Sequence, residues 1–279
     1  MNDHSKGGFM KCYLINLDKS RDRLEFMASQ FERLGAQFKR VEAVNGRAMS
    51  PLELASFTQI SKEWPAPLSP AEIGCFLSHR KCLEKIAAGE DAYAAVFEDD
   101  IRLSQGSSRF LASDHWIPKQ ADIVKIDAYG HEVLISNPVK NEGPYSISRL
   151  RSRHLQTGGY VVSREAARKL LPLMEKASAP VDHFLFDPND GPFNDFEIYQ
   201  ISPAICRQSG MESTIGQNRR PKQRPSLLGL VWREAKRLVM RTRRNLKGFI
   251  ANVTKTGRWG PFHLIGILRS SPAISHSQF

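Results

Sequence analysis

The stretch AYAAVFEDD, residues 92–100, decides the fold because it joins an apolar run to three consecutive acids. The residues from Ala92 to Phe97 are all apolar or aromatic and predict a buried strand. Glu98, Asp99 and Asp100 follow at its carboxyl end, which is the edge of an open α/β sheet where ligands bind. The stretch therefore predicts an α/β fold and the place of its functional site.

A strand, a helix and a second strand are predicted near the start of the chain. Residues 11–17 (KCYLINL) and 38–44 (FKRVEAV) have the apolar and β-branched content of strands. Between them, residues 21–34 space their apolar side chains as an amphipathic helix does, with Ser20 and Gly35 as its caps. Strand, helix and strand at this spacing form a βαβ unit.

Further helices and strands alternate along the chain. Helices are predicted at residues 51–57, 69–86 and 163–173, and strands at residues 122–126, 155–162 and 198–206. Alternation of this kind over about 200 residues predicts an α/β fold with a largely parallel sheet.

The composition is that of a globular protein with an unevenly placed charge. Of 279 residues, 25% are charged and 41% are hydrophobic, which excludes a mostly disordered chain and a disulfide miniprotein. The net charge is +11, but up to Gly216 there are 26 Lys and Arg residues against 28 Asp and Glu residues. From Gln217 onward there are 14 against one. The positive excess therefore belongs entirely to the C-terminal segment.

These patterns divide the chain into a disordered polar leader at residues 1–10, a catalytic-type domain at 11–216 and a basic tail at 217–279. The leader lacks the apolar core of a secretory signal, and no apolar run is long enough for a transmembrane helix. The four cysteines form no C-x-x-C pair, which argues against zinc and fits a reducing compartment. We therefore expect a cytoplasmic protein.

The tail contains one predicted amphipathic helix, residues 226–253, whose Lys and Arg residues fall mostly off its apolar stripe. Such a helix, here with Trp232, is typical of an anionic membrane interface. A helix packed on the first domain is the main alternative, and no nucleic-acid-binding motif accompanies the charge. We expect peripheral attachment to the inner face of the cytoplasmic membrane and no nucleic-acid partner. Residues 254–279 are expected to be loosely ordered, with a short apolar anchor at 262–268.

The three acids are suited to hold a divalent cation. Carboxylates crowded at one strand end raise each other's pKa unless a cation lies between them. Oxygen ligands favour Mg²⁺ or Mn²⁺, and such ions commonly hold the phosphates of a substrate. The functional interpretation is a metal that bridges the protein and a diphosphate, and a solvated acidic turn is the alternative.

Four other segments accompany the acids in a fixed order. They are INLDKSRDR at residues 15–23, AEIGCFLSH at 71–79, GYVVSR at 159–164 and PVD at 180–182. In this order, with VFEDD at 96–100, the chain resembles glycosyltransferase family 25, the lipopolysaccharide and lipooligosaccharide core galactosyl- and glucosyltransferases. The resemblance covers residues 11–215. The departures from the family pattern are Phe97, the Gly158-Gly159 pair and His183.

The resemblance implies a GT-A-like, Rossmann-type domain that binds a nucleotide sugar. Asp100 would ligate Mn²⁺ or Mg²⁺ together with Glu98, and Asp99 or Glu98 would hold the ribose or a metal-bound water. The metal would neutralise charge on the departing UDP. The other residues implied at the donor site are Asn16, Asp18, Arg21, Arg23, Glu72, Ser78 and His79.

Ordinary structural roles compete with the assignments of four of these residues. Arg21 and Arg23 could pair with acids on the protein surface instead of phosphate. Glu72 stands three residues after Ser69 and could complete a capping box. His79 could be a core histidine with satisfied hydrogen bonds, which is the usual fate of a single histidine on an apolar helix.

The resemblance also implies an inverting transfer, which needs a base that lies apart from the metal acids and deprotonates the acceptor hydroxyl. Asp182 is the first candidate, with helix capping as its alternative role, and Asp127 is the second. His154 and His183 are further candidates for metal or phosphate binding.

We therefore expect transfer of a hexose, galactose before glucose, from its UDP-sugar to a lipid-linked oligosaccharide of the lipopolysaccharide core. One alternative is a protein hydroxylysine-type galactosyltransferase, because a collagen-modifying branch resembles the same family. Another is a non-catalytic membrane or RNA adaptor that retains the fold. The absence of a secretory signal and of an ER-retention tail argues against the first alternative, and the intact acids Glu98, Asp99 and Asp100 argue against the second.

Overall fold

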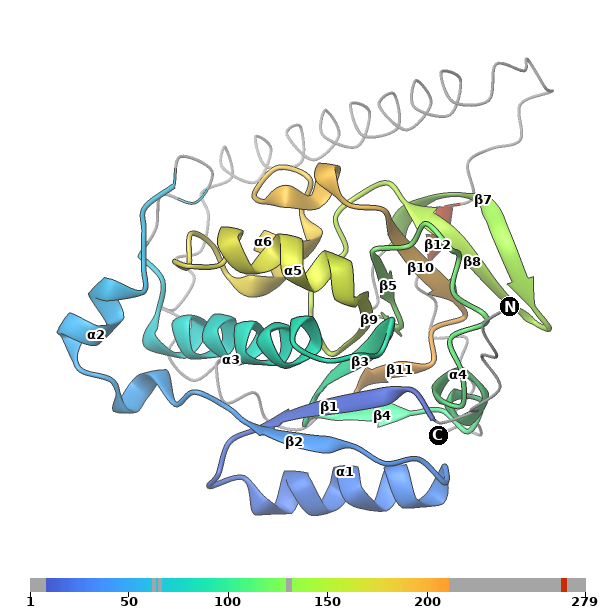
Figure 1. Ribbon diagram of the computed structural model, residues 1–279, viewed down its shortest axis with the longest axis horizontal. Helices are drawn as coiled ribbons and strands as arrows, with labels where there is room; N and C mark the ends of the chain where they lie inside the picture. Colours follow the sequence, from blue (N-terminus) through green and yellow to red (C-terminus); the bar gives the residue numbers. More distant parts are fainter. Residues whose placement is uncertain (1–8, 62–63, 65–66, 129–131, 211–266, 270–279) are drawn as a thin grey trace, which may run out of the picture.

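The computed structural model describes residues 9–61, 64, 67–128, 132–210 and 267–269. Within these residues the main sheet has nine strands in the order β12-β7-β8-β10-β5-β9-β3-β1-β2. Helices α3, α5 and α6 lie on one side of this sheet, and α1 lies on the other (Figure 1). The α/β class expected from the sequence is confirmed.

The first βαβ unit forms where the sequence predicts it. β1 (Lys11–Asn16) and β2 (Lys39–Glu42) are parallel neighbours, and α1 (Arg21–Arg33) connects them. Gly35 follows the helix with a φ of 65°, a left-handed conformation that glycine adopts without strain. Ser20 is the N-cap residue, but its side chain makes no capping hydrogen bond.

β3 (Tyr93–Glu98) pairs with β1 in parallel and is covered on both faces. Ala94 and Val96 belong to the core beneath α3 (Pro70–Ala87), whereas Ala95 and Phe97 belong to the core on the α1 side. Successive side chains of a strand face opposite ways, so a strand covered on both faces is apolar throughout. This explains the AYAAVF run.

The expectation of a largely parallel sheet was wrong. β9 (Gly159–Ser163) runs antiparallel between β3 and β5 (Ile123–Lys125), while β10 (Ile198–Ser202) is parallel to β5. β7 (Glu132–Glu142) and β8 (Tyr145–Leu150) add an antiparallel hairpin where no strand was predicted. A buried apolar run has the same composition in either direction, so the sequence predicts such a strand without its orientation.

A second sheet has three strands in the described residues. β4 (Ile101–Leu103) and β6 (Asp127–Ala128) follow β3 and β5 along the chain, and β11 (Cys206–Gln208) lies between them. The single strand expected at residues 198–206 is therefore two strands in two sheets. They are separated around Pro203, a residue that cannot donate to a sheet ladder.

Serine side chains cap three helices, and the capping box predicted for Ser69 and Glu72 is confirmed. Ser50 and Ser69 form capping boxes with Glu53 and Glu72, and the Ser163 side chain accepts a hydrogen bond from the Ala166 backbone N–H. The other helical elements are α2 (Pro51–Ser56), α4 (Ser107–Leu111), α5 (Arg164–Leu173), α6 (Val181–Phe186) and 3-10 turns at Gly46–Ala48 and Pro192–Asp195.

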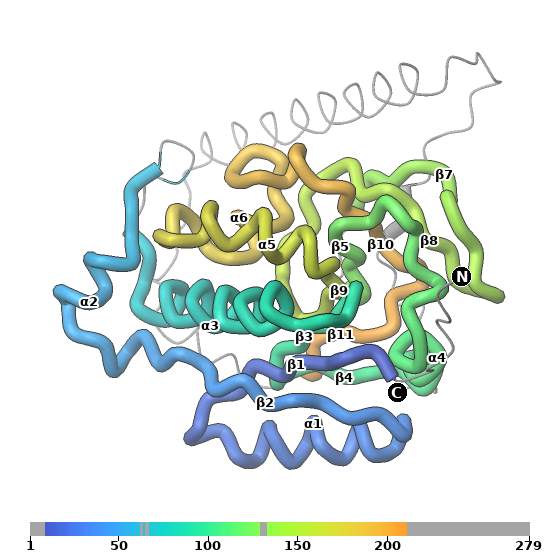
Figure 2. The backbone as a smooth tube through the Cα atoms, in the orientation of Figure 1, coloured from blue at the N-terminus to red at the C-terminus, as the bar shows by residue number. Residues whose placement is uncertain are grey.

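Most of the leader and of the basic tail lies outside the described residues, including the helix predicted at 226–253. Within the tail, β12 (Ile267–Arg269) pairs antiparallel with β7, so the anchor predicted at 262–268 overlaps an edge strand of the sheet. Figure 2 traces the backbone from β2 on one side of the molecule to β7 on the other. Within the described ranges, no helix has the length and apolarity needed to cross a membrane.

Candidate functional site

A cleft lies at the carboxyl ends of β1, β2 and β3. The residues that follow each strand and the first turns of α3 form its walls. Its lining includes apolar Ile15, Leu17 and Val44, and polar Lys19, Ser20, Arg23, Asn45, Arg47, Ser78, Glu98, Asp99 and Asp100. This is the sheet edge at which the sequence predicted the site.

Asp99 is held by protein groups on both of its oxygens. Asn16 Nδ2 donates to Oδ2 at 2.7 Å, and Arg23 Nη1 donates to Oδ1 at 2.9 Å. Asn16 is itself fixed, because its Oδ1 accepts from Arg40 Nε at 3.0 Å. Arg23 therefore pairs with the acidic cluster rather than with the surface acids considered from the sequence. Asn16 and Arg23 therefore orient Asp99, and they hold the segment that follows β1 against the three acids at residues 98–100.

Glu98 is oriented by His79 and Thr157. His79 Nε2 lies 3.2 Å from Glu98 Oε1, and the Thr157 hydroxyl donates to the same oxygen. The other ring nitrogen of His79 lies 3.0 Å from the Tyr160 hydroxyl, and the whole imidazole is buried. Burial alone would raise the pKa of Glu98, but the hydrogen bonds from His79 and Thr157 outweigh it and lower that pKa. Glu98 is therefore held as a carboxylate at the wall of the cleft.

Asp100 differs from its two neighbours because one of its buried oxygens, Oδ1, has no hydrogen-bond partner among the residues that the structure describes. Its Oδ2 lies 3.7 Å from Arg23 Nη1. Burial, followed by the negative charge of Glu98, raises the pKa of Asp100 to about 7. An unpartnered carboxylate oxygen in an acidic cleft fits a bound divalent cation, which would satisfy this oxygen and lower the repulsion. Asp100 and Glu98 are thus the residues suited to hold Mn²⁺ or Mg²⁺.

Glu72 and Ser78 have structural contacts. The Glu72 carboxylate accepts from the Ser69 backbone N–H at 2.7 Å, which completes the capping box at the start of α3. The Ser78 hydroxyl donates to the Gly74 carbonyl oxygen at 2.6 Å and accepts from the Val44 backbone N–H at 2.8 Å. Ser78 thereby ties the segment after β2 to α3 and fixes one wall of the cleft.

Asp18 and Arg21 are not part of the cleft lining. Asp18 is exposed and forms an ion pair with Arg40 at 3.0 Å. Arg21 is exposed at the first position of α1. Of the charged residues at the first strand's exit, the structure therefore brings Arg23 and not these two residues to the acids.

The two candidate bases have different surroundings. Asp182, in the first turn of α6, is partly buried and accepts from the backbone N–H groups of His183 at 2.9 Å and Gln156 at 3.3 Å. Asp127 is 2% exposed, lies 3.1 Å from Lys125 Nζ and accepts from the Gly159 N–H. Burial raises the pKa of Asp127 even against the charge of Lys125. Asp182 is the more accessible of the two.

His183 and His154 lie apart from the acidic cluster. His183 Nδ1 contacts Asp190 Oδ2 at 2.8 Å and Asp187 Oδ2 at 3.6 Å, and the ligand atoms of these three residues are close enough to hold a metal ion. The same holds for the ligand atoms of Cys75, His79 and Glu98, of which Cys75 and Glu98 line the cleft and His79 is buried behind it. His154 is buried, and its Nδ1 contacts the side chain of Gln200 at 2.7 Å.

For several residues at the site, no pattern in a single sequence indicates their role. Thr157 and Tyr160 reach Glu98 and His79 only because β9 runs antiparallel beside β3. Lys125 is a fully buried lysine within an apolar strand. Asn45 and Arg47 could have been found, because they follow β2 and the carboxyl ends of parallel strands share one edge.

The described residues form a mixed α/β domain with a carboxylate cluster in a strand-end cleft, the place where α/β enzymes commonly bind their ligands. The model of glycosyltransferase family 25 (LPS biosynthesis protein) matches residues 9–185. The chain belongs to this family and is a glycosyltransferase, as the five ordered segments predicted. The non-catalytic adaptor is therefore not supported.

Relatives with assigned names agree with this family. The chain is 30% identical to the lacto-N-neotetraose biosynthesis glycosyltransferase LgtB of Neisseria gonorrhoeae, over 71% of this chain and 74% of that protein. It is 29% identical to the lipooligosaccharide biosynthesis protein lic2B of Haemophilus influenzae, over 71% and 76% of the two chains. Similar solved structures include a glycosyltransferase involved in glycosylation of the major capsid of PBCV-1, at 10% identity and a TM-score of 0.39, over 74% of this chain and 95% of that one.

Proposed function

We propose that the chain transfers a hexose from a UDP-sugar to a growing lipopolysaccharide or lipooligosaccharide core, and that its domain is of the GT-A type. The observation that carries the proposal is the unpartnered Oδ1 of Asp100 in an acidic cleft at the ends of three strands. The named relatives act in lacto-N-neotetraose and lipooligosaccharide biosynthesis, which supports this class of acceptor. Galactose is the first choice of donor sugar and glucose the second.

Some cleft residues bind the donor in this proposal, and others orient the residues that bind it. Asp100 and Glu98 would hold Mn²⁺ or Mg²⁺, and the ion would supply positive charge to the departing diphosphate. Asn16 and Arg23 keep Asp99 facing the cleft, and apolar Ile15 and Val44 offer a surface for the uracil base. These residues position the donor so that the sugar carbon bonded to the diphosphate faces the acceptor side.

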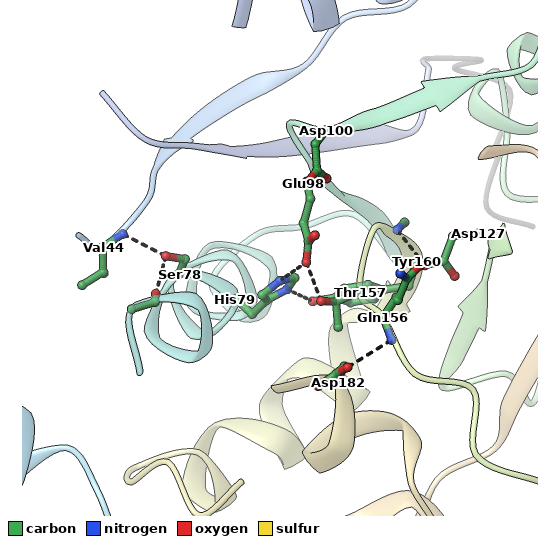
Figure 3. Close-up of polar contacts among 12 residues, drawn as sticks. Val44, Ser78, His79, Glu98, Asp100, Asp127, Gln156, Thr157, Tyr160 and Asp182 are labelled. Carbon is green, nitrogen blue, oxygen red and sulfur yellow. Dashed lines mark hydrogen bonds and ion pairs between the residues drawn. The ribbon is translucent and has the colours of Figure 1, made fainter. Parts of the chain in front are cut away.

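Asp182 is the proposed base of an inverting transfer. Gln156 and Thr157 lie between Asp182 and Glu98 (Figure 3), so the base is separated from the metal acids. The Asp182 carboxylate takes the proton of the acceptor hydroxyl while that oxygen attacks the sugar carbon from the face opposite the diphosphate. The bond to the diphosphate breaks in the same step, and UDP leaves with the electron pair.

A donor screen tests this proposal. We expect UDP-galactose with Mn²⁺, and UDP-glucose less strongly, to raise the melting temperature and to support sugar transfer or slow donor hydrolysis. A ligand at one hundred times its Kd adds about 2.7 kcal/mol to the free energy of unfolding. EDTA should remove the effect, and GDP-mannose is the control donor. Equal stabilisation by GDP-mannose, or none by any UDP-hexose with Mn²⁺, would contradict the proposal.

The basic tail is proposed to hold the enzyme on the inner face of the cytoplasmic membrane. We expect flotation with vesicles that contain anionic lipid and not with neutral vesicles. Each basic residue near an anionic surface contributes about 1 kcal/mol, so changing Arg241, Arg243 and Arg244 to Gln should weaken partitioning about 100-fold. The control changes exposed Lys119, Lys169 and Lys176 to Gln. Equal loss in both triple variants would attribute the binding to net charge and not to the tail.

A further inference from the structure

The segment of residues 156–159 connects the groups of the proposed site. Thr157 donates its hydroxyl hydrogen to Glu98, and the Gly158 carbonyl oxygen accepts from the Glu98 backbone N–H at 3.1 Å. The Gln156 N–H donates to Asp182 Oδ2, and the Gly159 N–H donates to Asp127 Oδ2. One short stretch of backbone therefore contacts the metal carboxylate on one side and the proposed base on the other (Figure 3).

Gln156 holds this stretch in an unusual conformation. Its φ is 77°, and among the described residues it is the only one other than glycine with a positive φ. This left-handed conformation brings a side chain close to its own carbonyl oxygen and is unfavourable for most residues, so surrounding contacts must maintain it. The peptide groups on both sides of Gln156 are fixed, because its N–H donates to Asp182 and its carbonyl oxygen accepts from Lys125 Nζ.

Lys125 contacts the backbone of Gln156 and is placed to maintain that conformation. Its side chain is fully buried. The ammonium group contacts the Gln156 carbonyl oxygen, lies 3.1 Å from Asp127 Oδ1 and sits 4.0 Å from the centre of the Phe186 ring. The Gln156 carbonyl oxygen accepts a hydrogen bond, Asp127 supplies the opposite charge, and the Phe186 ring faces the ammonium group. A buried ammonium group held between a carbonyl oxygen, a carboxylate and an aromatic ring is suited to orient these neighbours.

We propose that Lys125 is a positioning residue for sugar transfer. It fixes Gln156 in the left-handed conformation, and residues 156–159 thereby set the distance between the Asp182 base and the Glu98 metal carboxylate. Asp127 supports the segment by holding Lys125 and the Gly159 N–H. This inference rests on the proposed function, and it assigns Asp127 to the support of the site.

Substitutions at Gln156 separate the backbone conformation from the side chain. Gln156→Gly and Gln156→Asn tolerate a positive φ, whereas Gln156→Val resists it most. We expect kcat to be about tenfold lower in the Val variant than in the Gly variant. The KM for the UDP-sugar should change less than about twofold, because residue 156 is not in the lining of the donor cleft. Gln105→Gly and Gln105→Val, at an exposed position, form the matched control pair and should not differ.

Substitution of Lys125 tests the same contact with Gln156 from the side of the lysine. Lys125→Met together with Asp127→Asn avoids an unpaired buried charge, and we expect at least a tenfold loss of kcat with little change in donor KM. Adding Gln156→Gly should restore part of kcat, because glycine needs no help to adopt a positive φ. Stabilisation by Mn²⁺ and UDP, measured by thermal melting, reports whether the donor site is intact.

The outcomes distinguish this inference from the proposed function. Equal kcat in the Gly and Val variants of Gln156, or no rescue in the Lys125 background, would overturn the positioning role while transfer by the wild type stands. Parallel loss of donor stabilisation and kcat in the Lys125 double variant would assign Lys125 to the general stability of the fold. Absence of both transfer and donor stabilisation in the wild type would remove the proposed function, and this inference with it.

Discussion

Asp100→Asn is expected to abolish metal-dependent transfer while making the metal-free protein more stable. The carboxylate has an unpartnered buried oxygen and lies beside Glu98 and Asp99. An amide of the same shape removes the repulsion and the preferred cation ligand together. We expect at least about a hundredfold loss of transfer, because the charge on the departing diphosphate would no longer be neutralised. The stabilisation given by Mn²⁺ should also disappear.

The stability gain has a defined pH window. The pKa of Asp100 is raised from 3.8 to about 7, so between these values the folded state binds more protons than the unfolded state. The stability of the metal-free wild type is therefore lost as pH rises through this window, and Asn at position 100 should recover about 1–4 kcal/mol at pH 8. Metal binding has the opposite dependence, because Mn²⁺ competes with the proton below pH 7.

Thermal melting at pH 6 and pH 8, with and without Mn²⁺, tests both statements. Asp114→Asn, at an exposed position, is the control and should match the wild type. Asp99→Asn should instead lower stability, since it weakens the acceptor of Asn16 and Arg23. Full Mn²⁺ stabilisation of the Asp100→Asn protein would rule out Asp100 as a metal ligand.

Gly74→Ala is expected to disrupt the wall of the donor cleft. A Cβ atom at position 74 would lie 2.5 Å from the Val44 carbonyl oxygen and 2.7 Å from the Gly46 nitrogen, and both are backbone atoms. Alanine improves helix propensity by about 1 kcal/mol, but the forced separation of α3 from the segment after β2 outweighs this gain. We expect a net loss of about 2–3 kcal/mol in unfolding free energy and weaker stabilisation by Mn²⁺ with UDP.

Denaturant unfolding and donor titration measure the two effects of Gly74→Ala. Lys85→Ala, on the exposed side of the same helix, is the matched control and should change neither quantity. Ser78→Ala should show a smaller effect in the same direction, about 1 kcal/mol, because it removes the hydroxyl that joins Val44 to α3. A Gly74→Ala protein as stable as the wild type would show that α3 can shift freely.

Local signals predicted much of the fold. The βαβ unit of residues 11–42 and the capping box at Ser69 depend on neighbouring residues, and the sequence contains those neighbours. The antiparallel direction of β9 and the β7–β8 hairpin depend on contacts between distant segments. A strand buried on both faces is apolar in either direction, so its composition could not give its orientation.

The site was predictable to the extent that it follows one strand. Glu98, Asp99 and Asp100 were found together because they lie at the end of β3, but the partners of Glu98 and Asp99 come from β1, α1, α3 and the segment before β9. Glu72 illustrates the opposite case, since its capping role was visible in the sequence and the structure bears it out. Lys125 gave no signal, because a lysine in a strand is ordinarily solvated and its burial depends on Gln156 and Asp127.

The antiparallel direction of β9 determines which segments of the chain form the two sides of the proposed site. A parallel strand brings its end to the ligand edge of the sheet, whereas an antiparallel strand brings its beginning there. The donor side is therefore built from residues that follow β1, β2 and β3, while the segment that faces Asp182 precedes β9. The two sides of the proposed site have separate origins in the sequence, so we expect an insertion or exchange before Gln156 to reshape the side that faces Asp182 and to leave the donor cleft intact.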